Sequence, residues 1–252
     1  MKLHSVPTIL PLILAATAAL PLSAATVNIA AGTYTENFNS LAASGINEPA
    51  NGWTGRYGAS SNALGTINPI GPMRAWSHTT GQFKNVSSSN IASSSDATVQ
   101  SGNTDRAFAL RQTQSTGNPG MSINLNFAST GMNIQSINFD LLMLDVQGMS
   151  ATFQIQYGLG SNPSAFTTLG TWSDPSVFGA TSFTFDRDDF GSSLDNQSQA
   201  WFRLVALDAA TGSGSFDMVA IDSFSITATA APEPSALLLG GLGLLGLLRR
   251  RR

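Results

Sequence analysis

The chain has 252 residues, a formal net charge of −3 and no cysteine. Lys2, the four C-terminal arginines and Glu233 lie outside residues 26–231, so this central region holds 7 basic and 14 acidic residues, a net charge of −7. An acidic body lacks the basic stripe of a nucleic-acid-binding protein. Without cysteine it has neither disulfides nor thiolate-ligated metal sites, and its stability must come from an ordinary hydrophobic core.

The first 25 residues have the pattern of a signal peptide. Lys2 precedes the apolar stretch Val6–Leu22, and Ser23-Ala24-Ala25 supplies the small residues that signal peptidase requires. Prolines at positions 7, 11 and 21 disfavour a buried helix here. We expect signal peptidase to cleave after about Ala25 and the mature chain to be exported.

The segment Ser40–Thr104 is rich in Ser, Asn, Gly, Thr and Pro, which predicts long surface loops. Trp53, Arg56 and Tyr57 lie among glycines at positions 52, 55 and 58, and Trp76 follows in a second Pro/Gly-bounded segment. Aromatic rings stack on the apolar faces of sugars, and arginine supplies hydrogen bonds. These four residues are a candidate carbohydrate site, and the alternative is that the tryptophans belong to the core.

Alternation of apolar and polar residues predicts strands over Met121–Phe127, Ala151–Tyr157, Ser182–Asp186 and Trp201–Leu207. In this pattern Leu125 and Leu204 face the core, while Asn124 and Arg203 face water. Trp172 and Trp201 are expected to be core residues. A further strand or pair of strands is predicted over Phe216–Thr229, with one face formed by Phe216, Met218, Ala220, Asp222, Phe224 and Ile226.

Turn-forming clusters at 115–120, 158–163 and 211–215 separate these strands, and no long helical pattern is present. The sequence therefore predicts one all-β domain over 26–231, a jelly-roll-type β-sandwich with a loop-rich first half. Thr35–Leu41 and Ala220–Ile226 resemble the opening and closing strands of laminin-G-like, MAM-like and carbohydrate-binding jelly rolls. The resemblance implies that the two terminal strands lie side by side.

Calcium is a candidate cofactor, because an acidic exported domain without disulfides gains stability from a hard cation held by oxygen ligands. If the ion ties the first strand to the last, Glu36 lies near Asp222 or Asp217. The alternative is that these carboxylates are exposed and only keep the protein soluble.

The sequence offers little for catalysis. Between residues 26 and 231 the only histidine is His78, and no Gly-x-Ser-x-Gly motif is present. Glu36 and Glu48 are the only glutamates there, whereas glycosidases need two carboxyl groups across the scissile bond. Asp186–Asp189 is interpreted as a solvated turn. We therefore expect a protein that is not an enzyme.

The last 21 residues form a tripartite tail. Pro232-Glu233-Pro234 is an extended break after the body, Ala236–Leu248 is an apolar run, and Arg249, Arg250, Arg251 and Arg252 end the chain. As a helix the apolar run reaches roughly 20 Å, short of the hydrocarbon core of about 30 Å. The arginines can snorkel to the cytoplasmic interface, which leaves the body outside.

This tail resembles the PEP-CTERM sorting signal. The resemblance implies transient insertion in the inner membrane, cleavage near Pro232–Pro234 by an exosortase, and transfer to the cell surface or extracellular matrix. Together these features predict an exported structural or adhesive protein of an extracellular polysaccharide. The alternatives are a carbohydrate-binding module that uses the Trp53–Tyr57 loop and, less favoured, an extracellular hydrolase.

Overall fold

The computed structural model of the protein describes residues 25–41, 51–68, 70, 82–89, 92–114 and 117–232. The strands in these ranges are β1 (Val27–Asn28), β2 (Gly32–Glu36), β3 (Trp53–Tyr57), β4 (Thr66–Asn68), β5 (Gln82–Ser87), β6 (Arg106–Arg111), β7 (Ser122–Ala128), β8 (Met132–Asp145), β9 (Met149–Ser150), β10 (Thr152–Leu159), β11 (Phe166–Ser173), β12 (Gly179–Asp186), β13 (Ala200–Val205), β14 (Thr211–Gly212) and β15 (Met218–Ala230). Three short helices accompany them, η1 (Asn39–Leu41), α1 (Ala97–Gly102) and α2 (Arg187–Phe190).

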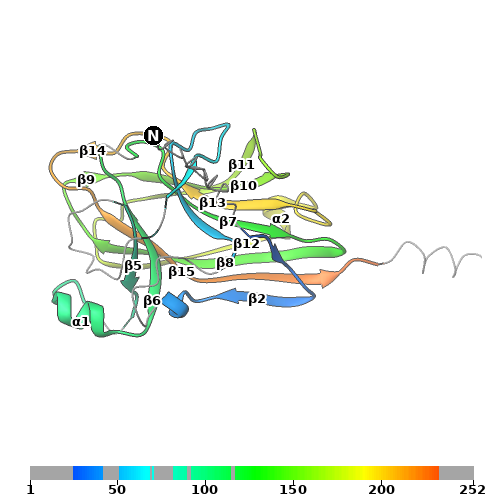
Figure 1. Ribbon diagram of the computed structural model, residues 1–252, viewed down its shortest axis with the longest axis horizontal. Helices are drawn as coiled ribbons and strands as arrows, with labels where there is room; N and C mark the ends of the chain where they lie inside the picture. The colour runs from blue at the N-terminus through cyan, green and yellow to red at the C-terminus, as the bar shows by residue number, and fades with distance from the viewer. Residues whose placement is uncertain are drawn as a thin grey trace, which may run out of the picture.

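Two sheets lie one over the other (Figure 1). Sheet A has the strand order β11-β10-β13-β7-β3-β4, with β1 added parallel to β7. Sheet B has the order β12-β8-β15-β6-β5, with β2 added antiparallel to β15. This arrangement confirms the predicted all-β sandwich of jelly-roll type. The pairing of β2 with β15 also places the first long strand beside the last, as expected.

The hydrophobic core lies between the two sheets. Sheet A contributes inward side chains such as Leu125 and Phe202, and sheet B contributes Phe139 and Phe224. The ring centroids of Phe202 and Phe224 lie 5.1 Å apart, and those of Phe139 and Phe202 also lie 5.1 Å apart, which joins the two layers directly. The inward assignment of Leu125 and Leu204 from the sequence is confirmed, since both are fully buried in this core.

Gly55 shows how closely the two sheets approach. A Cβ atom at this position of β3 would lie 2.3 Å from the Phe83 ring of β5. Only glycine lets the aromatic ring of sheet B reach the backbone of sheet A at this point.

The prediction that Asn124 and Arg203 face water is wrong. Both lie on the outer face of sheet A, yet neither has any exposed surface. The hairpin between β3 and β4 folds over this face, and its carbonyl oxygens at Ser60 and Ala63 accept hydrogen bonds from Arg203. Period-two alternation separates the two faces of a strand but does not tell whether a loop covers the polar face.

The face assigned to Phe216–Thr229 is also wrong over part of its length. The pairing of β15 with β8 shifts between Asp222 and Ser225, and Ser223 has a positive φ of 51°. This bulge moves the alternation by one residue. Val219 and Ile221 therefore point into the main core before the bulge and Phe224 after it, while Ala220 points to the opposite face.

Two local predictions need further correction. The segment Ser40–Thr104 is not only loop, because β3, β4, β5 and α1 lie within it. Asp186–Asp189 is not a simple turn. Asp186 caps the one-turn helix α2 in a capping box, in which the Asp189 carboxylate accepts a bond from the Asp186 backbone N–H.

Candidate functional site

The candidate site is a groove on the outer face of sheet A, which we call the sheet A groove. Its volume is about 640 Å³, within the range of small-molecule and oligomer sites. The lining residues are Arg56, Leu64, Gly65, Thr66, Ile67, Asn126, Ser161, Asn162, Gln199 and Trp201. The groove thus lies across β7 and β13, between the β3–β4 hairpin on one side and the β10–β11 loop on the other.

An arginine–tryptophan pair forms one part of the groove. The Arg56 guanidinium carbon lies 5.0 Å from the centroid of the Trp201 ring, close enough for a cation–π interaction. Arg56 Nη1 donates to the Gly65 carbonyl oxygen at 2.9 Å, and the Trp201 indole N–H donates to the Gly160 carbonyl oxygen at 3.0 Å. Both hydrogen bonds end on groove-forming loops, so the pair fixes those loops to the sheet.

Amide and hydroxyl groups supply the remaining polar surface. The Gln199 side-chain amide donates to Asn126 Oδ1 at 3.1 Å across β13 and β7. Ser161 and Asn162 are exposed or partly exposed in the β10–β11 loop. These groups can donate to and accept from hydroxyl-rich ligands, and no carboxylate, histidine or cysteine is found among the described lining residues.

Arg203 anchors the hairpin wall, by which we mean the β3–β4 hairpin at the side of the groove, to sheet A. Its Nε donates to Gln156 Oε1 at 2.7 Å, and its two Nη atoms donate to the carbonyl oxygens of Ala63 and Ser60, each at 3.0 Å. The guanidinium carbon also lies 3.3 Å from the centroid of the Phe166 ring. Arg203 therefore ties β10, β11 and the β3–β4 hairpin together next to the groove.

The structure divides the four residues of the predicted carbohydrate site. Trp53 is only 2% exposed and packs in the core against Phe38 and Phe224, with its indole N–H donating to Tyr34 Oη. The expectation that the Trp53 ring projects from a loop is therefore wrong, and the alternative that Trp53 belongs to the core is confirmed. Arg56 lines the groove, Tyr57 is 40% exposed, and Trp76 lies outside the described residues.

The sequence predicts that two further tryptophans, Trp172 and Trp201, are core residues. Trp172 belongs to the main core. Trp201 is buried, at 3% exposure, but it lies on the outer face of sheet A rather than between the sheets. It occupies the position of β13 between the inward Ala200 and Phe202, so alternation itself indicates the outward face.

The three predicted calcium ligands do not converge. Glu36 pairs with Phe224 in the β2–β15 register, while Asp217 precedes β15 by one residue. At about 3.3 Å per residue these positions are roughly 20 Å apart. Glu36 shares the inward face of its partner Phe224, whereas Asp222 pairs with Asp140 on the outward face before the bulge. Among the described residues, no three His, Cys, Asp or Glu side chains are grouped to hold a metal ion.

The carboxylates of these residues have other contacts. Glu36 Oε1 accepts from the backbone N–H of Phe38 at 2.7 Å, and Asp217 Oδ1 accepts from the backbone N–H of Gln147 at 2.5 Å. Burial raises the pKa of both side chains, although these hydrogen bonds oppose the shift. Calcium binding by this protein stays a prediction.

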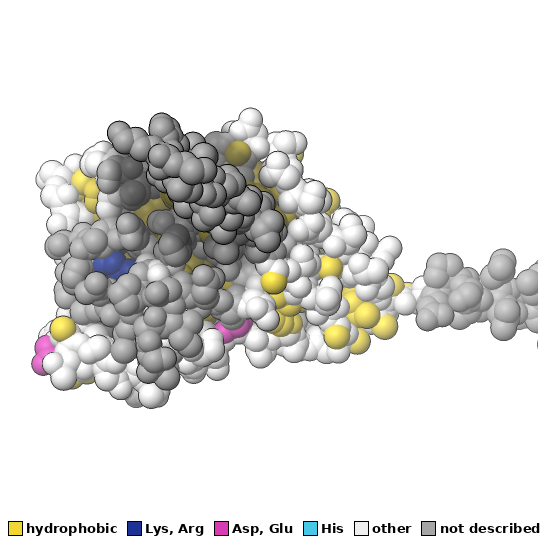
Figure 2. All heavy atoms as spheres, viewed as in Figure 1, with side chains coloured by type: hydrophobic (Ala, Val, Ile, Leu, Met, Phe, Trp, Pro, Cys, Tyr) yellow, Lys and Arg dark blue, Asp and Glu magenta, His cyan; other side chains and the backbone are white. Residues whose placement is uncertain are grey.

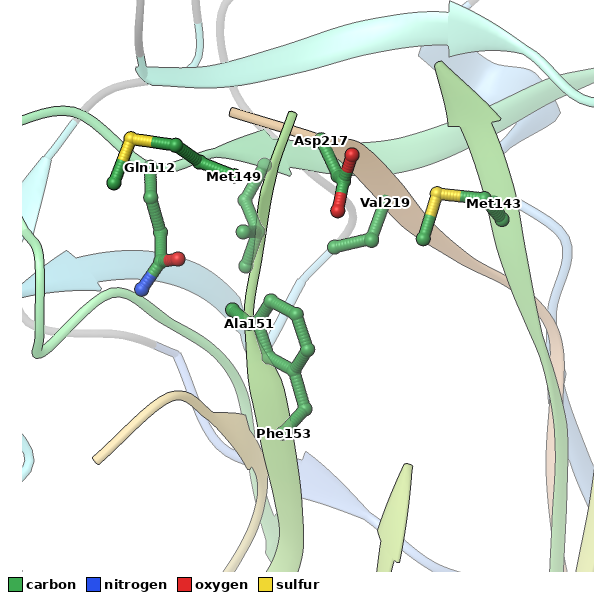
Figure 3. A pocket seen from close by; sticks show the side chains of 8 residues that line it. Gln112, Met143, Met149, Ala151, Phe153, Asp217 and Val219 are labelled. Carbon is green, nitrogen blue, oxygen red and sulfur yellow. The ribbon is translucent and has the colours of Figure 1, made fainter. Parts of the chain in front are cut away.

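A second, much smaller space lies inside the sandwich, beside Asp217, Gln112 and Phe153 (Figure 3). Its volume is about 10 Å³, enough for roughly one water molecule. The space is too small for an organic ligand, so the sheet A groove remains the candidate site.

Sequence reasoning missed most of the groove. The sequence pattern does not mark five of the lining residues as a site, because they come from three separate segments that only the strand order brings together. These residues are Asn126, Ser161, Asn162, Gln199 and Trp201. The usable signal was the run of polar residues and tryptophan at outward positions of β7 and β13. His78 and Glu48 lie outside the described residues.

The sorting tail begins immediately after the fold. β15 ends at Ala230, the Ala231 backbone N–H donates to the Gly131 carbonyl oxygen, and Pro232 is exposed. Glu233, Pro234 and Arg249–Arg252 lie outside the described residues, as does the apolar run 236–248. The helices of the described part are all too short, or too polar, to cross a bilayer.

Comparison with solved structures finds similar chains at low sequence identity. The K1 cleaved adhesin domain of the Lys-gingipain of Porphyromonas gingivalis W83 is 12% identical, with a TM-score of 0.43 over 80% of this chain and 99% of that chain. The xylan-binding module CBM15 is 12% identical, with a TM-score of 0.41 over 81% and 100%. The CBM22-1 xylan-binding domain of Paenibacillus barcinonensis Xyn10C is 10% identical, with a TM-score of 0.41 over 80% and 98%. No curated protein matches the sequence.

A family model matches the tail. Residues 230–252 match the PEP-CTERM protein-sorting motif, which confirms the resemblance seen in Pro232–Pro234, the apolar run and the terminal arginines. The motif implies that an exosortase sorts the chain as an exported protein. This chain therefore contains a β-sandwich body followed by a PEP-CTERM sorting motif.

Proposed function

We propose that the protein is a non-catalytic adhesive component of the cell surface or extracellular matrix, which binds polysaccharide in the sheet A groove. The observation that supports this function best is the lining of that groove. It combines amides, hydroxyls, one guanidinium and a tryptophan around about 640 Å³ of open space. The amides, hydroxyls and guanidinium can bind sugar hydroxyls, while the Trp201 ring, which is 3% exposed and lies under Arg56, holds that guanidinium in position.

The groove residues are held before any ligand arrives. Trp201 and Gln199 lie on or beside a central strand, and Arg56 is fixed by its hydrogen bonds to Thr54 Oγ1 and the Gly65 carbonyl oxygen. Binding to positioned groups costs less conformational entropy than binding to mobile loops. The arrangement therefore lowers the entropic cost of binding a sugar polymer in the groove.

A non-catalytic role fits the chemistry of the groove. Glycoside hydrolysis canonically needs two carboxyl groups on opposite sides of the scissile bond. The described residues of the groove lining include no carboxyl group, and the one cation among them is an arginine, which is a poor acid or base near neutral pH. Incubation of the protein with a bound polysaccharide should release no new reducing ends, and their release would contradict this part of the proposal.

Processing at both ends is part of the proposed function. Signal peptidase would remove residues 1–25, and an exosortase would cleave near Pro232–Pro234 after transient insertion in the inner membrane. The exposure of Pro232 directly after β15 supports access by a protease. Intact-mass measurement of surface-extracted protein should give a species from about Thr26 to the Pro232–Pro234 motif. A species that retains Arg249–Arg252 would mean that the tail is a permanent anchor.

Groove binding is tested with a blocking variant. Ser161 is exposed in the β10–β11 loop and lines the groove, so Ser161→Trp should fill the groove without disturbing the core. Ser192 is exposed after α2, away from the groove lining, and Ser192→Trp is the matched control. On a polysaccharide array the surface-extracted protein and the control should bind alike, and Ser161→Trp should lose binding. Equal binding by all three proteins would contradict the groove as the site.

A further inference from the structure

We infer that the sheet A groove prefers acidic polysaccharides, with Arg56 as the group that receives a sugar carboxylate. This inference rests on the proposed function, since it names the ligand class of the same groove. It follows from how charge is distributed between the two sheets and from the partners of Arg56.

The charges of the strands are segregated by sheet. Within the described residues, the strands of sheet A contain Arg56 and Arg203 and no aspartate or glutamate. The strands of sheet B contain five carboxylates, at Glu36, Asp140, Asp145, Asp186 and Asp222, against three cations at Lys84, Arg106 and Arg111. The body is acidic overall, yet the sheet that forms the groove floor is positive.

The hydrogen-bond partners of Arg56 are neutral. Its Nε donates to Thr54 Oγ1 at 3.3 Å, its Nη1 donates to the Gly65 carbonyl oxygen at 2.9 Å, and its guanidinium lies over the Trp201 ring. Both ion pairs found in the described part of the chain involve other arginines, Arg111 with Asp145 and Arg187 with Asp195. Within the described residues, Arg56 therefore brings a positive charge to the groove without forming an ion pair.

Arg203 adds a second positive charge next to the groove. It is fully buried, and its acceptors are the Gln156 side-chain oxygen and two backbone carbonyl oxygens. Burial lowers the pKa of Arg56 and lowers that of Arg203 to about 10, and among the described residues no carboxylate opposes either shift. At neutral pH both groups remain charged. A ligand carboxylate would offset part of the desolvation cost that these cations bear.

Few described side chains on the face seen in Figure 2 are charged. On the face seen in Figure 2, charged side chains show only as small separate patches, and most described atoms belong to uncharged polar or apolar groups. A guanidinium binds a carboxylate through short, charge-assisted hydrogen bonds, while the neighbouring amides bind the sugar hydroxyls. Uronic acid polymers combine both kinds of group in each repeating unit.

The test uses two polymers with the same sugar backbone, one with free carboxylates and one in which methyl esters neutralise them. Isothermal titration of the surface-extracted protein with polygalacturonate and with fully methyl-esterified polygalacturonate compares the same backbone with and without carboxylates. We expect roughly tenfold tighter binding of the acidic polymer, the effect of one charge-assisted contact, and loss of the preference at high salt. Arg56→Gln should remove the preference, and Arg56→Lys should retain part of it because the charge remains.

The control variant is Arg187→Gln. It changes the net charge by the same amount but lies on α2, outside the groove lining, so it should keep the preference. Melting temperatures check that each variant folds. Equal affinity for the two polymers would overturn the acidic preference and leave polysaccharide binding intact. Binding of neither, alongside binding of other polymers on the array, would also overturn it, and binding of no polymer at all would overturn the proposed function itself.

Discussion

The two outer faces of the sandwich rest on one core but have opposite characters. The outer face of sheet A is polar, and the residues it contributes beneath and beside the groove include Ser122, Asn124, Asn126, Gln156, Trp201 and Arg203. The outer face of sheet B carries a second, apolar cluster formed by Val86, Ala107, Ala109, Leu142, Leu144, Met218 and Ala220. A covered apolar face adds stability. A polar face with an open groove can bind a ligand.

Sheet B also concentrates negative charge at one point. Asp222 lies directly opposite Asp140 in the β15–β8 register, and Asp105 adds to the repulsion. Asp222 is buried, and burial, more than these neighbours, raises its pKa from 3.8 to about 6. Like charges on paired residues destabilise a sheet. The comparison teaches that, among the strands, carboxylates occur only in sheet B, while the charged strand residues of sheet A are both arginines.

The largest expected effect comes from breaking the core that both faces share. Leu125→Asp or Leu204→Asp places an unpaired charge on a fully buried inward position, where no partner can compensate for its desolvation. We expect the cooperative unfolding transition to disappear, as seen by circular dichroism on heating. A sharp transition in either variant would show that the inner face of sheet A is not the core assigned here.

The next effect compares two buried arginines, Arg203 on the outer face of sheet A and Arg106 on β6 of sheet B. Arg203→Met and Arg106→Met each leave several buried oxygens without a donor, on the outer face of sheet A and around Asn85 and Gln100 next to sheet B. Each should lower the free energy of unfolding by about 3 kcal/mol in denaturant titration. Only Arg203→Met should also weaken polysaccharide binding, because Arg203 holds the hairpin wall of the groove. An equal loss of binding in both variants would contradict the division of roles.

A smaller effect concerns Asp222 and pH. Since its folded pKa is raised above the unfolded value, the folded state binds an extra proton between about pH 3.8 and pH 6. The stabilisation is complete below pH 3.8 and is lost as pH rises through about 6. The full difference is on the order of 2–3 kcal/mol. Asp222→Asn should therefore raise the melting temperature at pH 7 and flatten its decline from pH 4 to pH 7. An unchanged decline would assign the pH dependence to other groups.

The smallest expected effect is a null result at Glu36. Because Glu36 and Asp222 point to opposite faces, Glu36→Gln should not alter any response of the melting temperature to calcium or chelator. Glutamine also keeps an oxygen that can accept from the Phe38 backbone N–H. Loss of a calcium-induced shift in this variant alone would show that the terminal strands do share an ion, and that the face assigned to one of the two residues is wrong.

The fold could be predicted further than the site. Alternation identified β7, β10, β12 and β13, and the inward direction of Leu125, because those signals are local. The same alternation puts Arg203 in water, since its covering by the β3–β4 hairpin depends on contacts far apart in sequence. Alternation could not reveal the bulge at Ser223 either, because a single extra residue produces no repeating pattern in the sequence.

Site prediction failed for a related reason. Trp53 and Trp201 look alike in sequence, because each lies at the start of a strand. The alternation of side chains nevertheless points Trp53 between the sheets and Trp201 to the outer face. Arg56 was found because it stands among glycines and aromatics. Its groove partners come from segments that only the order of strands in sheet A brings together.

The most direct test of the central claim, that the outer face of sheet A is the binding face, is residue-level mapping of a bound ligand. Backbone amide NMR shifts of the isotopically labelled, processed protein would be followed during titration with polygalacturonate oligomers. We predict that the shifts cluster at residues 56, 64–67, 126, 161–162 and 199–201. Shifts confined to β8, β12 and β15 of sheet B would contradict the assignment of binding to sheet A.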